Sequence, residues 1–128
     1  MVTPAAARAT VERYIDRHTN GDIEGILTCF APDARAVDPV GTDPHVGTEA
    51  LRAFFTGTHA LCDRLELVLT GPIRVAGSSV AFPMQAVSDV GGTKMVVDII
   101  DIFAVDDDRK ISAMRAFWDM AEMRPYDG

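Results

Sequence analysis

The sequence predicts an α+β domain in which three N-terminal helices pack on a strongly curved antiparallel or mixed β-sheet that encloses an apolar cavity. Two observations lead to this prediction. Up to about residue 60, apolar residues recur at spacings of three and four, which is the period of a helix. From Leu65 onward they alternate at period two, and short Gly or Asp turns separate the runs, as in antiparallel strands. Helices and a sheet in this order pack as layers around a core, and a ligand would bind in the concave interior.

Length and composition narrow the class of protein. A chain of 128 residues is long enough for one hydrophobic core and short for two, so we expect a single domain over residues 1–128. The net charge is −7, and no run of Lys or Arg occurs, which argues against nucleic acid or an anionic membrane as partner. No apolar run is long enough to span a bilayer and no secretory leader is recognisable, so we expect a cytoplasmic protein.

Cysteine and histidine usage indicates neither a disulfide framework nor a metal site. Cys29 and Cys62 have neither the number nor the spacing for either one. The three histidines, His18, His45 and His59, are scattered without ligand spacing. We therefore expect two reduced cysteines and no metal.

Start and stop signals predict the three helices. Thr3 before Pro4 caps the first helix, which ends at Asn20-Gly21 and turns Tyr14 toward the core. Asp22 caps a second helix over residues 23–31. Thr48 caps a third, from residue 49 to about 55 or 58.

The segment between the second and third helices is extended. Residues 34–37 lead into Asp38-Pro39-Val40-Gly41, and the proline biases Asp38 away from helix. Asp38 therefore lies at a strand end or turn, where an aspartate is common for structural reasons alone. The sheet follows in four strands, over residues 65–73, 79–87, 94–105 and 110–120.

The third of these strands places a carboxyl group on an apolar face. At period two, Asp101 shares one face with five large apolar residues: Met95, Val97, Ile99, Phe103 and Val105. The opposite face is also largely apolar and predicts cover by a helix, another sheet or a second subunit. Because an unpaired buried carboxylate is costly, Asp101 is expected to be a neutral acid that donates a hydrogen bond in an apolar pocket. A misjudged register, or a structural Asp bonded to a buried amide, is the alternative.

Tyr14 and the inward faces of two strands each have a structural and a functional interpretation. Tyr14 is either a packed ring with its hydroxyl in water or a polar group of the cavity. The inward faces of strands 79–87 and 110–120, which include Phe82, Met84, Met114 and Trp118, form either plain core or the wall of a pocket for a flat apolar ligand.

Six short motifs, in order and at nearly constant spacing, resemble the bacterial steroid delta-isomerases (ketosteroid isomerases). The match covers about residues 3 to 120, and no single motif is specific. The motifs are Arg13-Tyr14; Asn20-Gly21-Asp22 with Gly25-Ile26; Asp38-Pro39-Val40-Gly41; Gly47-Thr48; Val96-Val97 with Ile100-Asp101 and Phe103; and Met114-Arg115-Ala116-Phe117-Trp118.

The resemblance implies a fold, a reaction and roles for three residues. It implies the cone-shaped fold of nuclear transport factor-like proteins, a homodimer, and isomerisation of a delta-5-3-ketosteroid to its conjugated delta-4 isomer without a cofactor. Asp38 matches the general base, and Tyr14 and Asp101 match the two donors of the oxyanion hole; a carboxylic acid kept neutral there is a known feature of this family. We expect the steroid to contact seven apolar or aromatic residues: Phe55, Phe82, Met84, Val97, Ile99, Met114 and Trp118.

The sequence departs from the family pattern at Phe55, where a second tyrosine usually hydrogen-bonds the oxyanion tyrosine. Asp98 and Ile102 also replace residues that are commoner in the family, and Asp98 has no physical account. Dehydratases and epoxide hydrolases of the same fold need a His-Asp pair or an Asp-Arg-Asp set, and no His lies on an inner strand face. The alternative function is a non-catalytic or weakly active steroid- or lipid-binding protein.

Overall fold

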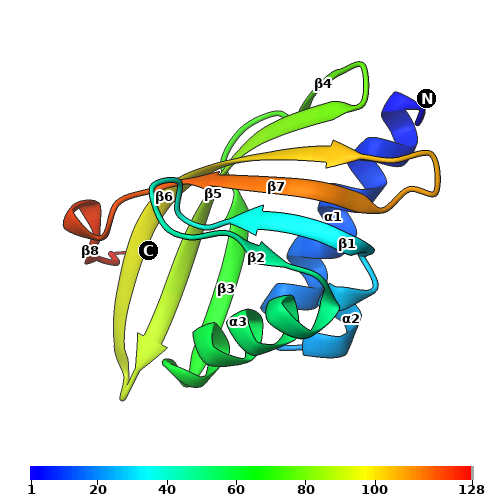
Figure 1. Cartoon of the computed structure of the whole chain (residues 1–128). Helices are drawn as coiled ribbons and strands as arrows, with labels where there is room; N and C mark the ends of the chain where they lie inside the picture. The colour runs from blue at the N-terminus through cyan, green and yellow to red at the C-terminus, as the bar shows by residue number, and fades with distance from the viewer. Residues whose placement is uncertain (128) are drawn as a thin grey trace.

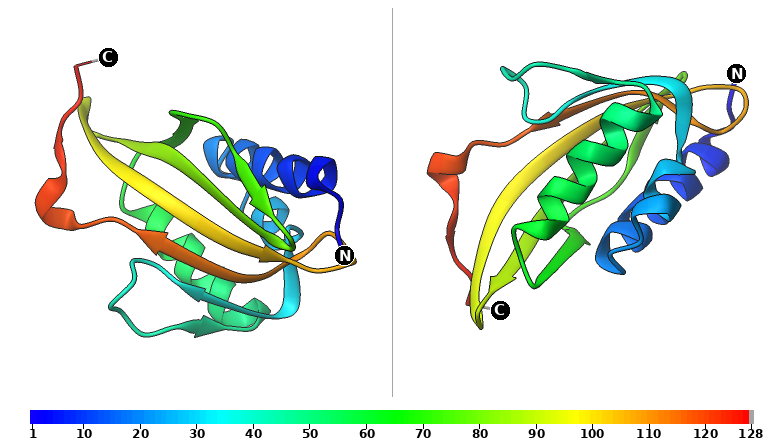
Figure 2. Two further views of the ribbon diagram at one scale, coloured as in Figure 1. Left: turned by 90° about the horizontal axis from the view of Figure 1, so that it is seen from above. Right: turned by 60° about the horizontal axis from the view of Figure 1, so that its bottom comes forward.

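The computed structural model describes residues 1–127 and has the predicted α+β architecture (Figures 1 and 2). The helices are α1 (Pro4–Thr19), α2 (Ile23–Leu27), α3 (Thr48–Ala60) and the short 3-10 helix η1 (Met120–Glu122). The strands are β1 (Phe30–Val37), β2 (His45–Val46), β3 (Arg64–Leu69), β4 (Arg74–Ala76), β5 (Ser79–Val90), β6 (Thr93–Val105), β7 (Ile111–Phe117) and β8 (Arg124–Pro125). None of the helices within residues 1–127 combines the length and the hydrophobicity needed to cross a membrane.

The strands form one curved, mixed sheet. Its order is β2-β1-β7-β6-β5-β3, with β4 paired to β5 and β8 paired to β6. Every pair is antiparallel except β1 with β7, which is parallel. The long strands β5 and β6 bend along their length, and α1 and α3 lie against the concave side of the sheet (Figure 2). The interior between these layers holds the core and the cavity described below.

The first helix begins as the sequence predicts. Thr3 Oγ1 accepts a 3.1 Å hydrogen bond from the Ala6 amide, and Pro4 occupies the first turn, where its missing N–H is not needed. Tyr14 and His18 are buried on the inner side of the helix, four residues apart. Together with Thr10, one helix therefore presents three polar side chains to the interior.

The second helix is shorter than predicted. It ends at Leu27, and Phe30–Val37 forms a strand that pairs with β2 and β7. The prediction of helix to residue 31 was wrong because these long-range pairings outweigh local helical periodicity. The predicted cap Thr48 was also wrong: Gly47 precedes the helix with a φ of +88°, a conformation that glycine adopts at little cost.

Strand boundaries also differ from the prediction. The strand predicted over residues 65–73 ends at Leu69, the separate short strand β4 follows it, and both pair with β5. The strand predicted over residues 79–87 runs on to Val90. The segment over 110–120 leaves the sheet after Phe117 and continues into η1. The loop over 42–47 contains the short strand β2, which pairs with β1.

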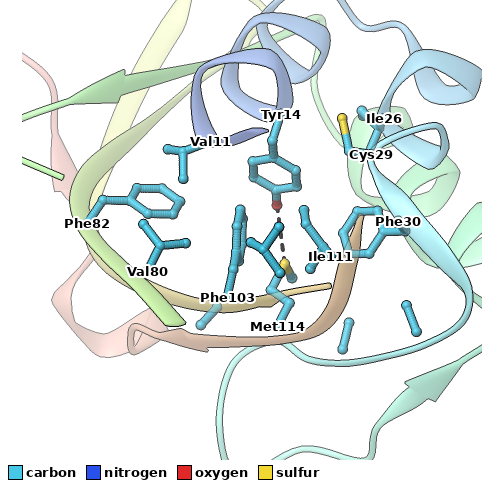
Figure 3. Close-up of a cluster of buried hydrophobic side chains, with 14 of the residues drawn as sticks. Val11, Tyr14, Ile26, Cys29, Phe30, Val80, Phe82, Phe103, Ile111 and Met114 are labelled. Atoms are coloured by element: carbon cyan, nitrogen blue, oxygen red, sulfur yellow. Dashed lines mark hydrogen bonds between the residues drawn. The ribbon is translucent and has the colours of Figure 1, made fainter. Parts of the chain in front are cut away.

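The predicted faces of β6 are confirmed. Asp101 is 1% exposed and the side chains of Phe103 and Val105 on the same face are buried. They join a core cluster with α1 and β5, drawn in Figure 3. On the opposite face, Ile100 is 52% exposed and Asp98 is exposed, paired with Gln85 and Arg124. The second face is thus open in the middle of the strand, whereas Val96 on the same face is buried beside β8.

Candidate active site

An apolar cavity of about 240 Å³ lies between the helices and the concave face of the sheet. It brings together Tyr14 from α1, Asp38 from the end of β1 and Asp101 from the middle of β6. The remaining lining is largely apolar, and no Lys or Arg is among the lining residues. The cavity suits an uncharged apolar ligand with a few polar contacts.

Asp101 is the most deeply buried carboxyl group of the site. Both of its oxygens are buried and have no hydrogen-bond partner among residues 1–127. Burial, and to a lesser degree the charge of Asp38, raises the pKa of Asp101 well above its usual value. The group is therefore a neutral acid with an O–H that it can donate to a ligand.

Tyr14 is the second neutral donor. Its ring is 2% exposed, and its hydroxyl donates to the Met114 sulfur at 3.5 Å (Figure 3). A thioether is a weak acceptor, so a ligand oxygen can replace it. Burial is the main cause that raises the pKa of Tyr14 well above its usual value, and the charge of Asp38 adds to it. The phenol is therefore protonated at neutral pH.

Asp38 follows β1 in the bend that the sequence predicts. Its Oδ1 accepts a 2.6 Å hydrogen bond from Trp118 Nε1–H. Burial raises the pKa of Asp38, whereas the Trp118 hydrogen bond and then the charge of His45 lower it. Burial is the larger effect, so the pKa of Asp38 lies above that of free aspartate. A general base works best when its pKa is near the working pH, so this shift suits Asp38 to accept a proton.

Five of the seven expected steroid contacts line the cavity, and two do not. The lining includes Phe55, Met84, Val97, Ile99 and Trp118. Phe82 and Met114 instead belong to the packed core. The Phe82 ring packs edge-on against Phe103, with 5.0 Å between ring centroids, and the Met114 sulfur contacts the Tyr14 hydroxyl. Val11 of α1 lies near Phe82 in the same core cluster (Figure 3).

The cavity also contains residues that the sequence argument did not assign to it. His18 is buried and lines the wall; its place four residues after Tyr14 on one helix face was the available signal. Leu61 and Cys62 after α3, and Met120 and Met123 after β7, also line the cavity. Their contribution depends on how the chain turns after each element, which no local pattern predicts. Among residues 1–127, no group of three or more His, Cys, Asp or Glu side chains is arranged to hold a metal ion.

Chemically, the arrangement combines one base with two neutral donors in a dry site. Two fixed donors can stabilise negative charge that develops on a carbonyl oxygen, and the base can remove a proton from a neighbouring carbon. The three groups come from different elements, so the geometry depends on the whole fold rather than on one motif.

Comparison with known proteins identifies the family. Residues 11–120 match the model of the SnoaL-like domain. The chain is 34% identical to a steroid delta-isomerase of Nocardioides simplex over 119 residues, which is 93% of this chain and 94% of that protein. It is 30% identical over 122 residues to the epoxide hydrolase LasB of Streptomyces lasalocidi, of whose length it spans 40%.

A solved structure has the same fold. The structure of SalBIII, described as an epoxide hydrolase/cyclase-like enzyme in pyran ring formation in the polyether salinomycin, superposes with a TM-score of 0.88 at 26% identity. The match covers 98% of this chain and all of that one. These relatives are enzymes that share the cone fold. The chain therefore belongs to the SnoaL-like domain family, in the nuclear transport factor-like superfamily that also contains the steroid delta-isomerases.

Proposed function

We propose that the chain isomerises a delta-5-3-ketosteroid to the conjugated delta-4-3-ketosteroid without a cofactor. The observation that carries this proposal is the convergence of Tyr14, Asp38 and Asp101 on one apolar cavity, with both oxygens of Asp101 buried and unpaired. The identity of 34% with a steroid delta-isomerase over nearly the full length of both chains supports it.

In the proposed mechanism, Asp38 moves one proton between two carbons. Its carboxylate takes the proton from carbon 4 and the resulting carboxylic acid returns it to carbon 6, so the steroid is isomerised with no net change in protonation. Between the two steps, negative charge lies on the 3-oxygen of a dienolate. Tyr14 and protonated Asp101 donate hydrogen bonds to this oxygen, and one such donor typically lowers the barrier by about 2.7–4 kcal/mol.

The direct test is formation of the conjugated enone. 5-Androstene-3,17-dione is added to the wild type, to Asp38→Asn and to Asp43→Asn, and the ultraviolet absorbance of the enone is followed. Asp43 is an exposed loop aspartate, so Asp43→Asn should retain wild-type rates while Asp38→Asn loses nearly all activity. Absence of enone with the wild type would refute the isomerase proposal.

A second experiment addresses the donor role of Asp101. A phenolic steroid analogue, which places an oxygen where the dienolate oxygen would be, should bind Asp101→Leu clearly more weakly than the wild type. Unchanged affinity would mean that Asp101 does not contact the ligand oxygen. Tight steroid binding without any enone would favour the non-catalytic binding protein.

Epoxide opening is the second candidate reaction, because Asp38 and Asp101 share one cavity, LasB is named an epoxide hydrolase, and SalBIII is described as an epoxide hydrolase/cyclase-like enzyme. Asp101 could protonate the epoxide oxygen while Asp38 takes the proton from the nucleophile, which is either water or a hydroxyl group of the substrate. An apolar hydroxy-epoxide incubated with the wild type would then give a diol or cyclic ether. We favour the isomerase because the similarity to the steroid delta-isomerase covers nearly all of both proteins.

A further inference from the structure

His18 lines the same cavity but has no role in the proposed reaction. It stands on α1 one turn after Tyr14, and its side chain is 4% exposed. Its ring packs edge-on against Tyr14, with 4.6 Å between ring centroids, and against Phe55, with 5.1 Å. The cavity wall therefore contains an imidazole held by aromatic neighbours.

Only one nitrogen of this imidazole is paired. His18 Nδ1 lies 3.0 Å from Nε2 of His59 on α3, whereas His18 Nε2 is buried without a hydrogen-bond partner among residues 1–127. In that part of the chain, the other buried and unpaired side-chain polar atoms are the two oxygens of Asp101. Buried unpaired polar atoms are uncommon and destabilising. Since all three belong to residues that line one cavity, we take a bound ligand to be what pairs them.

The imidazole is neutral and can present either a donor or an acceptor. Burial, and then the nearby His59, lower the pKa of His18 to about 3. If His18 Nδ1–H donates to His59, then His18 Nε2 is an acceptor; if His59 Nε2–H donates, then His18 Nε2–H is a donor. His59 also borders a small polar pocket with Asn20 and Asp63, where it can exchange protons with water. The pair can therefore change tautomer without changing charge.

We propose that His18 Nε2 is a second polar subsite of the cavity, which hydrogen-bonds an uncharged hydroxyl or carbonyl oxygen of the ligand. This oxygen is distinct from the one held by Tyr14 and Asp101, so the substrate is a steroid oxygenated at a second position. Carboxylate or phosphate substituents do not fit, because no Lys or Arg lines the cavity. His59 is a positioning residue that holds the ring and its tautomer. The choice of a steroid rests on the proposed function.

The test compares ligands that differ by one oxygen. Androst-4-en-3-one, and a set of its monohydroxy and mono-oxo derivatives, are titrated against the wild type, His18→Leu, His18→Gln and Thr58→Val. At least one derivative should bind the wild type about tenfold more tightly than the parent, as expected for one neutral buried hydrogen bond. His18→Leu should remove this gain and leave the affinity for the parent within about twofold. His18→Gln should retain part of the gain.

Thr58→Val is the matched control, because Thr58 also lines the cavity but its hydroxyl already donates to the Phe54 carbonyl at 3.0 Å. It should keep the full gain in affinity.

Nitrogen-15 spectra of labelled histidine supply an independent readout on the folded wild type. The tightest derivative, and not the parent, should shift the resonance of His18 Nε2 while the ring stays neutral. His59→Leu should alter the tautomer ratio of His18 before ligand is added.

The outcomes separate this inference from the proposed function. If no derivative gains affinity, or if the gain persists in His18→Leu, the subsite is refuted even where the enone assay is positive. If no steroid binds at all and no enone forms, the steroid class fails together with the subsite. Should His18→Leu not fold, His18→Gln and the nitrogen-15 shift on the wild type decide the question.

Discussion

The indole Nε1–H of Trp118 donates a 2.6 Å hydrogen bond to Oδ1 of Asp38 across 80 positions of sequence. The contact joins the residue that follows β7 to the residue that follows β1, two strands that pair in parallel. Parallel neighbours end at the same edge of the sheet, and this places the two side chains beside one another at the cavity. The hydrogen bond favours the carboxylate form of Asp38, against the burial that disfavours it.

Replacing Trp118 by Phe should therefore raise the pKa of Asp38 and move the acidic limb of the pH–rate profile to higher pH. A hydrogen bond to a charged group contributes about 1.5–3 kcal/mol, so kcat/KM on that limb should fall by about tenfold or more. The loss should be smaller at alkaline pH, where Asp38 is ionised in both proteins. Enone formation measured across the pH range checks this, and an unshifted acidic limb would contradict it.

The neutral Asp101 should make stability depend on pH. Its pKa is raised in the folded protein, so above the unfolded value of about 3.9 the folded state binds more protons and stability falls with rising pH. The free energy of unfolding keeps falling until the pH passes the pKa of Asp101 in the folded protein. Asp101→Leu removes this dependence and the unpaired polar group, and should raise the free energy of unfolding at pH 7 by about 1–3 kcal/mol. Urea unfolding from pH 4 to 8 measures the free energy of unfolding of each protein. Asp43→Asn is the control, and its free energy of unfolding should depend on pH as that of the wild type does.

How far the sequence predicts this site depends on the kind of pattern involved. The alternation in β6 correctly placed Asp101 in the interior, and the helical stripe correctly turned Tyr14 inward, because each follows from a local period. Period two identifies a face but not a position along it. Phe82 and Met114 share inward faces with Met84 and Trp118, yet they lie in the filled core while the other two line the cavity.

The errors have a common cause in long-range pairing. Ala31 fits a helical period, but β1 needs it as a strand residue beside β7. His18 lies one turn after Tyr14 on α1, yet its contact with His59 joins residues 41 positions apart on two helices. Neither fact is encoded in a window of neighbouring residues, so the structure was required to find them.

Phe55→Tyr should restore a feature that the resemblance implies. Phe55 is 1% exposed and packs near Phe30 and His18, and the Tyr14 hydroxyl now donates only to a sulfur. A phenol at position 55 that donates to the Tyr14 oxygen would make Tyr14 a stronger donor, so kcat should rise by about three- to tenfold, or about 0.7–1.4 kcal/mol. The added oxygen in a packed site should cost about 1–3 kcal/mol of stability. Steady-state kinetics and thermal unfolding test both effects; a lower kcat with unchanged KM would contradict the first.

The uncovered outer face of the sheet should bring two copies of the chain together. Ile100 on β6 is 52% exposed, Val40 is 42% exposed and Phe117 on β7 is 37% exposed, and together they border one shallow hollow. Contiguous exposed apolar residues of this kind mark interaction surfaces. We expect sedimentation equilibrium to give twice the 13.8 kDa of one chain.

Ile100→Lys should weaken association by at least about tenfold, since it buries a charge at the contact. Leu61→Lys, which changes a 79% exposed apolar residue elsewhere, should leave the mass unchanged. A monomeric wild type at micromolar concentration would refute this prediction.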